Sequence, residues 1–338
     1  MAKQKSARRQ PGYKVTNWSQ YNNALKQRGS LEVWIDGTVF DNWEGQLSAA
    51  NAGKNGHPFI YPAFFIELVL RLGMVFHQPL RQTEGFTRSI LQLLKLPIVV
   101  PDYTTLCRRR TNLKVSPQRL CKDTVAIIAD STGLKFYGEG EWKVKKHGAG
   151  KHRQWRKLHL HIDTDGEVRV SILTDNAASD GETIWDLLDG EAAQVTDAYA
   201  DGAYDQRGVY DALDLKGVSG VHIPPQKNAK IWIHGNAKAP PHPRDENLRV
   251  IRKTSRSGWK QRSGYHVRSL IETAMFRYKR TIGEKVTSRS LAAQQTETTI
   301  GCDILNRMAK LGMPNSTWQS QPSISSRARA MGRMESAM

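Results

Sequence analysis

The sequence predicts an α/β protein in which a helical N-terminal region precedes a domain built on a mixed sheet. Apolar residues recur at helical spacing between Pro62 and Arg110, whereas short β-branched runs alternate with helical segments from Thr124 onward. The length of 338 residues predicts two domains, or one elaborated domain with a small appendage.

The helical region begins at Pro62, a residue suited to the first position of a helix. After a break at residues 95–101, Asp102 can cap a short helix that ends in Arg108, Arg109 and Arg110. This arrangement resembles a helix-turn-helix with basic residues on its second helix, so the three arginines are candidate DNA contacts. An ordinary helical hairpin with a basic surface fits the same residues.

The catalytic domain begins with an apolar run, residues 124–129, which predicts a buried strand ending at Asp130. Residues 158–162 and 168–172 alternate in polarity around the turn residues Asp165 and Gly166, which predicts an antiparallel pair. These segments extend the first strand into a meander.

Helices and strands then alternate. Ser179 and Glu182 have capping-box spacing before a helix, and residues 195–200 form a strand-like run that ends in Asp201. A helix over residues 206–213 and a strand over 221–223 follow. Three antiparallel strands extended by parallel ones match the ribonuclease H-like fold, with a mixed five-stranded sheet.

Composition sets the expected domain boundaries. We expect a basic flexible arm at residues 1–30, a helical DNA-binding region at 31–120, the catalytic domain at 121–312 and a disordered tail at 313–338. Residues 224–263, which hold five prolines and many polar residues, read as a polar insertion in the catalytic domain.

The charge balance indicates a polyanionic partner. Lys and Arg number 50 against 32 Asp and Glu, a net charge of +18, and the excess gathers in residues 1–30, 141–161 and 251–290. The middle zone supplies further candidate DNA contacts: Trp142, Lys143, Lys145 and Lys146. Trp142 and Trp155 could stack on a flipped base or simply pack, and any single basic zone could be a solvated surface.

Several function classes find no support. The most apolar stretch, residues 57–76, contains Glu67, Arg71 and two prolines, so no membrane span and no signal peptide is expected, and we expect a cytoplasmic, nucleoid-associated protein. Three scattered cysteines argue against a disulfide framework or zinc knuckle. Neither a Gly-x-Ser-x-Gly elbow nor a P-loop is present.

Three acids are the candidate catalytic residues. Asp130 and Asp201 end strands, Glu272 lies on a later helix, and in the expected fold all three converge at one edge of the sheet. Such carboxylates are tolerable when divalent cations lie between them, and hard oxygen ligands suit Mg²⁺, with Mn²⁺ as a substitute. Two ions about 4 Å apart can activate an attacking oxygen and stabilise a departing one.

The helix around Glu272 was projected at about 100° per residue. Tyr265, Arg268, Glu272 and Lys279 then fall within an arc of about 60°, so the two cations could hold phosphates beside the carboxylate. A solvated face with an Arg268–Glu272 pair is the alternative. A core-facing stripe comprises Val267, Leu270, Ile271, Ala274, Met275 and Tyr278, and Phe276 does not fit it.

Other polar residues leave alternatives open. His159 and His161 face one side of a strand, where packing explains them better than metal binding because no third ligand is near. Asp180 reads as a first-turn acid of the capped helix, although a place near the catalytic edge stays open.

Specific motifs resemble a known family. Tyr265-x2-Arg268-x3-Glu272-x6-Lys279 resembles the Tyr-Arg-Glu-Lys signature of bacterial insertion-sequence transposases of the DDE class. The stretches at residues 130–135, 138–143, 200–205 and 223–225 are similar to the insertion sequence 5 family, nine-zero-three-like subgroup. The resemblance spans about Tyr13 to Pro314. It implies that Asp130, Asp201 and Glu272 form the catalytic triad and that the N-terminal region recognises terminal inverted repeats.

The expected function is therefore DNA transposition by two-metal phosphodiester cleavage and joining of 3′-hydroxyl ends to target DNA. A nuclease that cuts without joining and a DNA-binding regulator with inactive acids are the rival hypotheses. Synapsis of two ends implies a homodimer or higher oligomer on double-stranded DNA.

Overall fold

The computed structural model describes residues 12–35, 40–136, 155–233 and 240–319. The chain divides into two compact units: Met1–Val33 together with Met308–Met338, and Trp34–Arg307. The larger unit contains the helical region and the sheet, and the smaller one joins the two ends of the chain.

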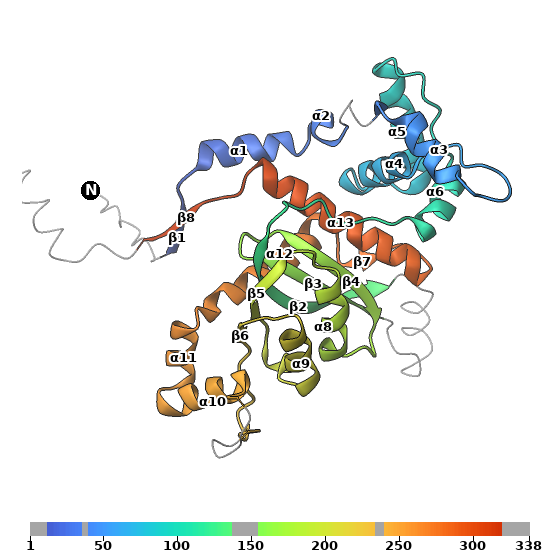
Figure 1. Cartoon of the computed structure of the whole chain (residues 1–338). Coiled ribbons are helices and arrows are strands. Elements are labelled where there is room, and N and C mark those ends of the chain that lie inside the picture. The colour runs from blue at the N-terminus through green and yellow to red at the C-terminus, as the bar shows by residue number, and fades with distance from the viewer. Residues whose placement is uncertain (1–11, 36–39, 137–154, 234–239, 320–338) are drawn as a thin grey trace, which may run out of the picture. The chain divides into compact units, whose positions relative to one another are not determined.

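The helical region of the larger unit consists of short helices (Figure 1). They are α3 (Trp43–Asn51), α4 (Ala63–Val75), α5 (Leu80–Leu93) and α6 (Tyr103–Arg109). The predicted cap is confirmed, because the Asp102 carboxylate accepts hydrogen bonds from the backbone N–H groups of Thr104 and Thr105. Among the described residues no single helix is long and apolar enough to cross a membrane; α4 and α5 meet that test only jointly, across a 107° bend.

A mixed sheet forms the centre of the larger unit. Its strands are β2 (Thr124–Phe136), β3 (Trp155–Asp163), β4 (Val168–Asp175), β5 (Gln194–Tyr199), β6 (Gly220–His222) and β7 (Lys285–Val286). The order is β4-β3-β2-β5-β6, with β7 beside β2. The predicted antiparallel meander β2-β3-β4 and the parallel strands β5 and β6 are confirmed, whereas β7 was not predicted.

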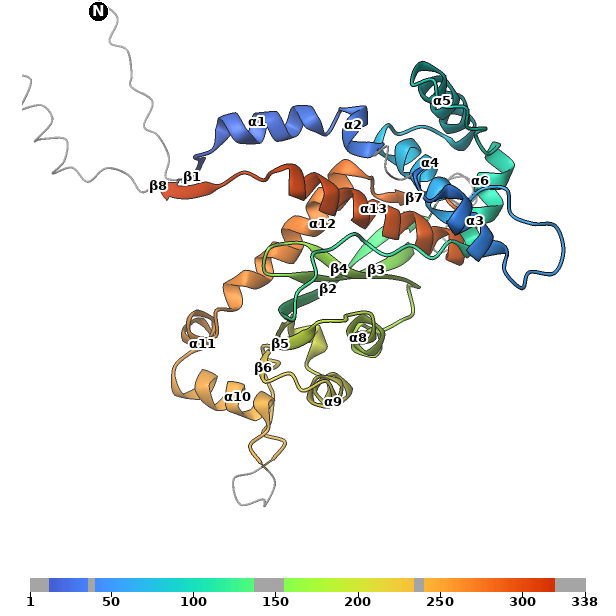
Figure 2. The same ribbon diagram turned by 45° about the horizontal axis from the view of Figure 1, so that its top comes forward.

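Helices cover both faces of this sheet (Figure 2). On one side lie α8 (Asp180–Asp189), whose predicted Ser179–Glu182 capping box is present, and α9 (Arg207–Leu215). On the other lie α12 (Ser269–Thr281) and α13 (Leu291–Leu311). A mixed α/β architecture of this kind is consistent with a ribonuclease H-like domain.

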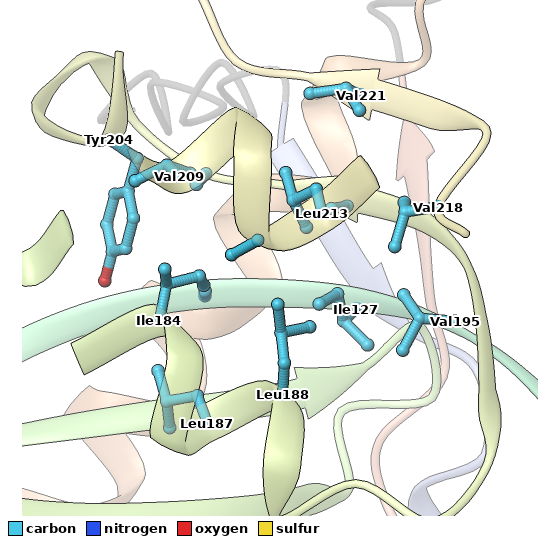
Figure 3. Packing of buried hydrophobic residues seen from close by; sticks show 14 of the residues in the cluster. Ile127, Ile184, Leu187, Leu188, Val195, Tyr204, Val209, Leu213, Val218 and Val221 are labelled. Carbon is cyan, nitrogen blue, oxygen red and sulfur yellow. The ribbon is translucent and has the colours of Figure 1, made fainter. Parts of the chain in front are cut away.

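Strand β2 supplies side chains to both cores because successive residues of a strand face opposite ways. Ile127 and Val195 pack with residues of α8 and α9, as Figure 3 shows. Ile128 instead packs with Leu160 of β3 and Ile271 of α12. Asp130 shares the parity of Ile128, which directs its side chain toward the α12 face.

The polar insertion is helical, in contrast to its loop-like composition. It contains α10 (Pro243–Lys253) and α11 (Arg256–Arg262). Arg244 is buried, donates to the Asp205 carboxylate at 2.6 Å and lies 3.9 Å over the ring of Trp232. This ion pair fastens the insertion to the segment that follows β5.

Helix α13 closes the outer edge of β4 with side-chain amides. Asn306 accepts a hydrogen bond from the Val168 N–H at 2.8 Å and donates to the Val168 carbonyl at 2.8 Å. Gln295 accepts from the Leu173 N–H and donates to the Ser171 carbonyl. These buried amides satisfy backbone groups that a further strand would otherwise bind.

The smaller unit differs from the expected flexible arm and disordered tail. It contains β1 (Gly12–Val15), α1 (Trp18–Gln27) and β8 (Ser316–Gln319), and β1 pairs antiparallel with β8. The helix α2 (Leu31–Trp34) lies where the two units meet in the sequence. Residues 1–11 and 320–338 lie outside the described residues.

Candidate active site

Asp130 lies on β2, and Asp201 lies two residues beyond the end of the neighbouring parallel strand β5. The register pairs Ile128 of β2 with Tyr199 of β5, and each acid lies two residues further along the chain. Asp130 does not end its strand as predicted, because β2 continues to Phe136 as the partner of β3. The two carboxylates are close enough for the charge of Asp201 to act on Asp130.

Arg268 lies between two of the three candidate acids. Its Nη2 donates to Asp130 Oδ2 at 2.7 Å, and its Nη1 donates to Glu272 Oε1 at 2.5 Å. The i,i+4 pair that the helical wheel offered as an alternative is therefore present, and it extends to Asp130 on β2. One cation thus bridges a carboxylate of the sheet and a carboxylate of α12.

Burial makes ionisation of Asp130 harder. Desolvation raises its pKa, the Ser131 N–H and the Arg268 guanidinium lower it, and the charges of Asp201 and Asp180 raise it further, with a net upward shift. The same cluster acts on the pKa of Arg268. Burial lowers this pKa, but Asp130 and Glu272 outweigh burial, so the pKa of Arg268 is raised. The site is therefore an acidic cluster with a largely buried Asp130 and an exposed Glu272, both paired with the Arg268 cation.

Tyr265 departs from the position that the helical wheel gave it. Residues Tyr265–Arg268 form the 3₁₀ helix η4 ahead of α12, which begins at Ser269, and Gly264 precedes them with a left-handed φ of 64°. A 3₁₀ turn has three residues per turn, so the spacing of about 100° does not apply there. Tyr265 is buried, and its hydroxyl donates to the Ala200 carbonyl at 3.1 Å, directly before Asp201.

The rest of the predicted helix face is as expected. Ile271, Ala274, Met275 and Tyr278 are buried, whereas Phe276 is 68% exposed. Lys279 is partly exposed and lies seven residues beyond Glu272, which is about 10 Å along an α-helix.

Asp180 lies beside this cluster and contacts groups on β3. Lys157 Nζ lies 3.0 Å from Asp180 Oδ1, and the buried His159 Nδ1 lies 3.4 Å from the same oxygen. Burial raises the pKa of Asp180, but hydrogen bonds from His159, Ser131 and Lys157 outweigh burial, so the pKa is lowered. Asp180 is thus a first-turn residue of α8 and also a neighbour of Asp130. The two positions that the sequence left open for it, in the capped helix and near the catalytic edge, are therefore compatible.

Tyr204 is a site residue that sequence reasoning missed. It lies in the 3₁₀ helix η3 (Gly202–Tyr204), which Asp201 caps by accepting from the Ala203 N–H. The side chain is fully buried, and its hydroxyl has no hydrogen-bond partner among the described residues. Burial and then the charges of Asp180, Asp130 and Asp201 raise its pKa far above the usual range. The sequence signal that could have identified Tyr204 is its position three residues after Asp201.

The remaining sequence-predicted residues lie elsewhere. Arg109 Nη1 donates to the Tyr61 carbonyl, and its guanidinium lies 4.1 Å over the ring of Phe59, whereas Arg108 is exposed. Arg110 lies at the start of η2 (Arg110–Asn112). Trp142, Lys143, Lys145 and Lys146 lie outside the described residues.

Two more residues were left open by the sequence. Trp155 is half-buried and packs against the backbone at Gly133, where a Cβ would lie 3.3 Å from its ring. His161 is buried, with Nδ1 near the Leu187 carbonyl.

Within the described residues no group of three His, Cys, Asp or Glu side chains is arranged to hold a metal ion. The donor chemistry nevertheless fits a divalent cation, because the carboxylates are hard oxygen ligands and a guanidinium already bridges Asp130 and Glu272. A metal ion at this place requires Arg268 to release at least one of them.

Two family models match the chain, and both are described as a transposase DDE domain. One covers residues 26–139 and the other residues 122–306, more than half of the chain. The chain belongs to the DDE transposase family. The second match contains Asp130, Asp201 and Glu272, together with the Arg268 that bridges two of them. DDE transposases act on DNA and generally depend on divalent metal ions.

Proposed function

We propose that this DDE transposase is the transposase of a bacterial insertion sequence of the insertion sequence 5 family, nine-zero-three-like subgroup. It binds the terminal inverted repeats, cleaves phosphodiesters at the element ends and joins the 3′-hydroxyl ends to target DNA. The main support is the arrangement of Asp130, Asp201 and Glu272 around Tyr265 and Arg268, where the charges of all three acids act on Tyr265.

In the proposed site, Asp130 and Asp201 would hold two Mg²⁺ or Mn²⁺ ions, and Glu272 would supply a further carboxylate ligand. Such ions activate an attacking oxygen and stabilise the departing one. Arg268, released from a carboxylate, grips a phosphate with two N–H groups, and Lys279 adds a point charge. Tyr265 acts indirectly: by holding the Ala200 carbonyl it fixes the backbone from which Asp201 projects.

DNA contacts extend beyond this site in the proposal. The helical region at residues 31–120 acts as the helix-turn-helix-like reader of the repeats, and Arg108 contributes from its exposed position. The basic segment at residues 1–30 and the zone with Trp142, Lys143, Lys145 and Lys146 add phosphate contacts. Two copies of the chain, each bound to one element end, form the active assembly.

Substitution of Asp130 tests the proposal. Asp130→Asn keeps the size of the side chain and removes its charge, so Mg²⁺-dependent cleavage and joining of a precleaved repeat end should fall below detection while DNA affinity stays within about threefold. Asp214→Asn on exposed α9 is the matched control and should retain both reactions.

Three outcomes would contradict the proposal. Normal joining by Asp130→Asn would remove Asp130 from the reaction. Cleavage without joining by the wild-type chain would favour a nuclease, and no metal-dependent cutting at all would favour a DNA-binding regulator.

A further inference from the structure

The two ends of the chain meet in one small ribbon. Strands β1 and β8 pair over four residues each, Tyr13 opposite Trp318 and Lys14 opposite Thr317 (Figure 1). Hydrogen bonds continue beyond the strands, from the Thr16 N–H to the Asn315 carbonyl at 2.8 Å and from the Asn315 N–H to the Asn17 side chain at 2.7 Å. The ribbon is therefore held in one register at its base.

The ribbon has two different faces, because cross-strand partners point the same way and successive residues alternate. Tyr13 and Trp318 share one face, where their rings form an edge-on contact at 5.0 Å. The other face carries Lys14, Thr317 and Gln319, with Gly12 opposite Gln319. Lys14, Thr317 and Gln319 are exposed, so this polar face presents a cation and hydrogen-bonding groups to solvent.

The unit that carries the ribbon has a large excess of positive charge in its sequence. Met1–Val33 and Met308–Met338 contain eleven Lys and Arg and only two acids, Glu32 and Glu335. The resulting charge of +9 is half of the net +18 of the protein, in less than a fifth of its residues. A surface of this kind attracts a polyanion.

We propose that the β1–β8 ribbon is a duplex DNA-binding element that places its polar face in the major groove. The B-DNA major groove is about 12 Å wide and admits a two-stranded ribbon. Lys14 then meets phosphate, Thr317 and Gln319 meet base edges or sugar, and the Tyr13–Trp318 pair stiffens the opposite face. Because Gly12 carries no side chain, the backbone can approach the DNA closely. The inference rests on the proposed function, since it assumes a DNA substrate.

A second copy of the chain is a poorer occupant of this ribbon. Pairing two ribbons edge to edge would bring together two units of +9 each, and like charges at an interface oppose association. Duplex DNA instead supplies the compensating charge. The ribbon also joins residues from both ends of the chain, so DNA affinity should depend on β8 although Ser316–Gln319 carries no charge.

The first test changes the charge of the polar face. Lys14→Gln in the full chain should weaken binding to a fluorescent repeat-end duplex and reduce the slope of log affinity against log salt concentration by about 1, as expected for one lost phosphate contact. Lys216→Gln, an exposed lysine paired with Asp189, is the control and should keep the wild-type slope. An unchanged slope in Lys14→Gln would overturn the proposal.

The second test breaks the ribbon without changing charge. Thr317→Pro removes a backbone donor from β8 and should weaken duplex binding at least fivefold, whereas Thr317→Ser keeps both that donor and the side-chain hydroxyl and should bind within about twofold of wild type. Wild-type affinity in Thr317→Pro would overturn the proposal. So would a changed oligomeric state in sedimentation of the DNA-free variant with unchanged DNA affinity, because the ribbon would then join copies of the chain.

Both measurements are made without divalent metal, so they do not depend on catalysis. If the wild-type chain binds the duplex but never cuts it, the proposed function fails. The effect of the ribbon variants on duplex affinity can still be measured in that case. If Lys14→Gln and Thr317→Pro bind normally while Asp130→Asn loses cleavage, only the ribbon proposal fails.

Discussion

Arg268 balances charges that would otherwise repel one another. Asp130 is mostly buried and feels the charges of Asp201 and Asp180, and the guanidinium offsets them while also holding Glu272. A phosphate can bind a guanidinium through two parallel hydrogen bonds, as a carboxylate can. Under the proposed function, Arg268 would therefore keep the DNA-free site intact and hold substrate in the bound one.

Substitution of Arg268 separates these roles. Arg268→Lys keeps the charge but cannot bridge two carboxylates, so single-turnover cleavage should fall at least tenfold while the melting temperature changes by less than about 3 °C, since the lysine still places a positive charge beside the largely buried Asp130. Arg249→Lys, at an exposed pair with Glu246, is the control. Wild-type cleavage by Arg268→Lys would show that the two-carboxylate bridge is dispensable.

His161 makes the stability of the sheet depend on pH. Burial lowers its pKa from 6.5 to about 4, although Glu191 nearby acts in the opposite direction. Because the folded pKa is depressed, the unfolded chain takes up the proton first, so the contribution of His161 is full above about pH 6.5 and is lost as pH falls toward 4. Burial raises the pKa of Glu191, but the hydrogen bond from Arg169 outweighs burial and lowers this pKa to about 2. Glu191 therefore adds a further loss of stability below pH 4.5.

Denaturant titrations at a series of pH values test this assignment. The urea midpoint of the wild-type chain should fall between pH 6.5 and 4, and His161→Gln should flatten that interval while retaining the later acid loss. The exposed His57→Gln is the control and should keep the wild-type profile. An identical slope in His161→Gln would place the titrating group elsewhere.

At the scale of elements, side chains of α13 bind the outer edge of β4, where a further strand would otherwise pair. A helix with buried Gln, Asn and Thr residues would be a poor core helix if those groups were unpaired. Here Asn306 and Gln295 bind the outer backbone of β4, so the polar side chains are the reason that the helix packs at the sheet edge. The amphipathic pattern of α13 could not reveal this, because its partner is backbone and carries no sequence signal.

Asn306→Ala should expose the importance of that contact. The Val168 N–H and carbonyl both lose a buried partner, which should lower the free energy of unfolding by about 3 kcal/mol in urea titrations. Asn228→Ala, in an exposed turn, should change it by less than about 0.5 kcal/mol. Equal stability of both variants would mean that water replaces the amide without loss.

At the scale of the whole molecule, Asp303 ties the helical region to the catalytic domain. Its Oδ2 accepts from Arg71 of α4 at 2.9 Å and from Arg307 at 2.8 Å, and its Oδ1 accepts from the Gln118 N–H. Arg71 is buried and also contacts Glu67. The two regions share one compact unit, and this carboxylate lies where they meet.

Asp303→Asn should therefore loosen both regions together. A buried Arg71 that loses this partner keeps only Glu67, which should lower the free energy of unfolding by about 3 kcal/mol and accelerate proteolysis within α4–α5. Arg307→Gln leaves the Arg71–Asp303 pair intact and should lower the free energy of unfolding by less than about 1 kcal/mol. Comparable losses in the two variants would contradict this account.

Local sequence rules predicted much of this fold, and long-range pairing decided the rest. The Asp165–Gly166 turn, the capping box at Ser179 and the buried stripe of α12 depend on neighbouring residues, and all three are present. The length of β2 depends on β3, and the turn at Tyr265 depends on the Ala200 carbonyl, 65 residues away. The helices of the insertion were missed because Pro, Lys and Asn dominated a segment that Arg244 anchors through Asp205.

The roles of the candidate site residues stay a prediction, whereas some of their contacts can be compared with the structure. The spacing around Glu272 offered an Arg268–Glu272 pair, which is present, and the contact of Arg268 with Asp130 was not predicted. The orphan hydroxyl of Tyr204 and the contacts of Asp180 depend on where η3 and α8 pack, which no local pattern encodes.

The amides of α13 have a consequence for how copies of the enzyme can assemble. A sheet extends when its edge strand pairs with a strand of another molecule. The outer edge of β4 is already hydrogen-bonded to side chains of the same chain at Val168, Ser171 and Leu173. At the opposite margin, β6 offers only three residues. Joining two folded transposase molecules by continuing the central sheet through β4 would require α13 to detach, so crowding of folded chains should not nucleate fibrils from that margin.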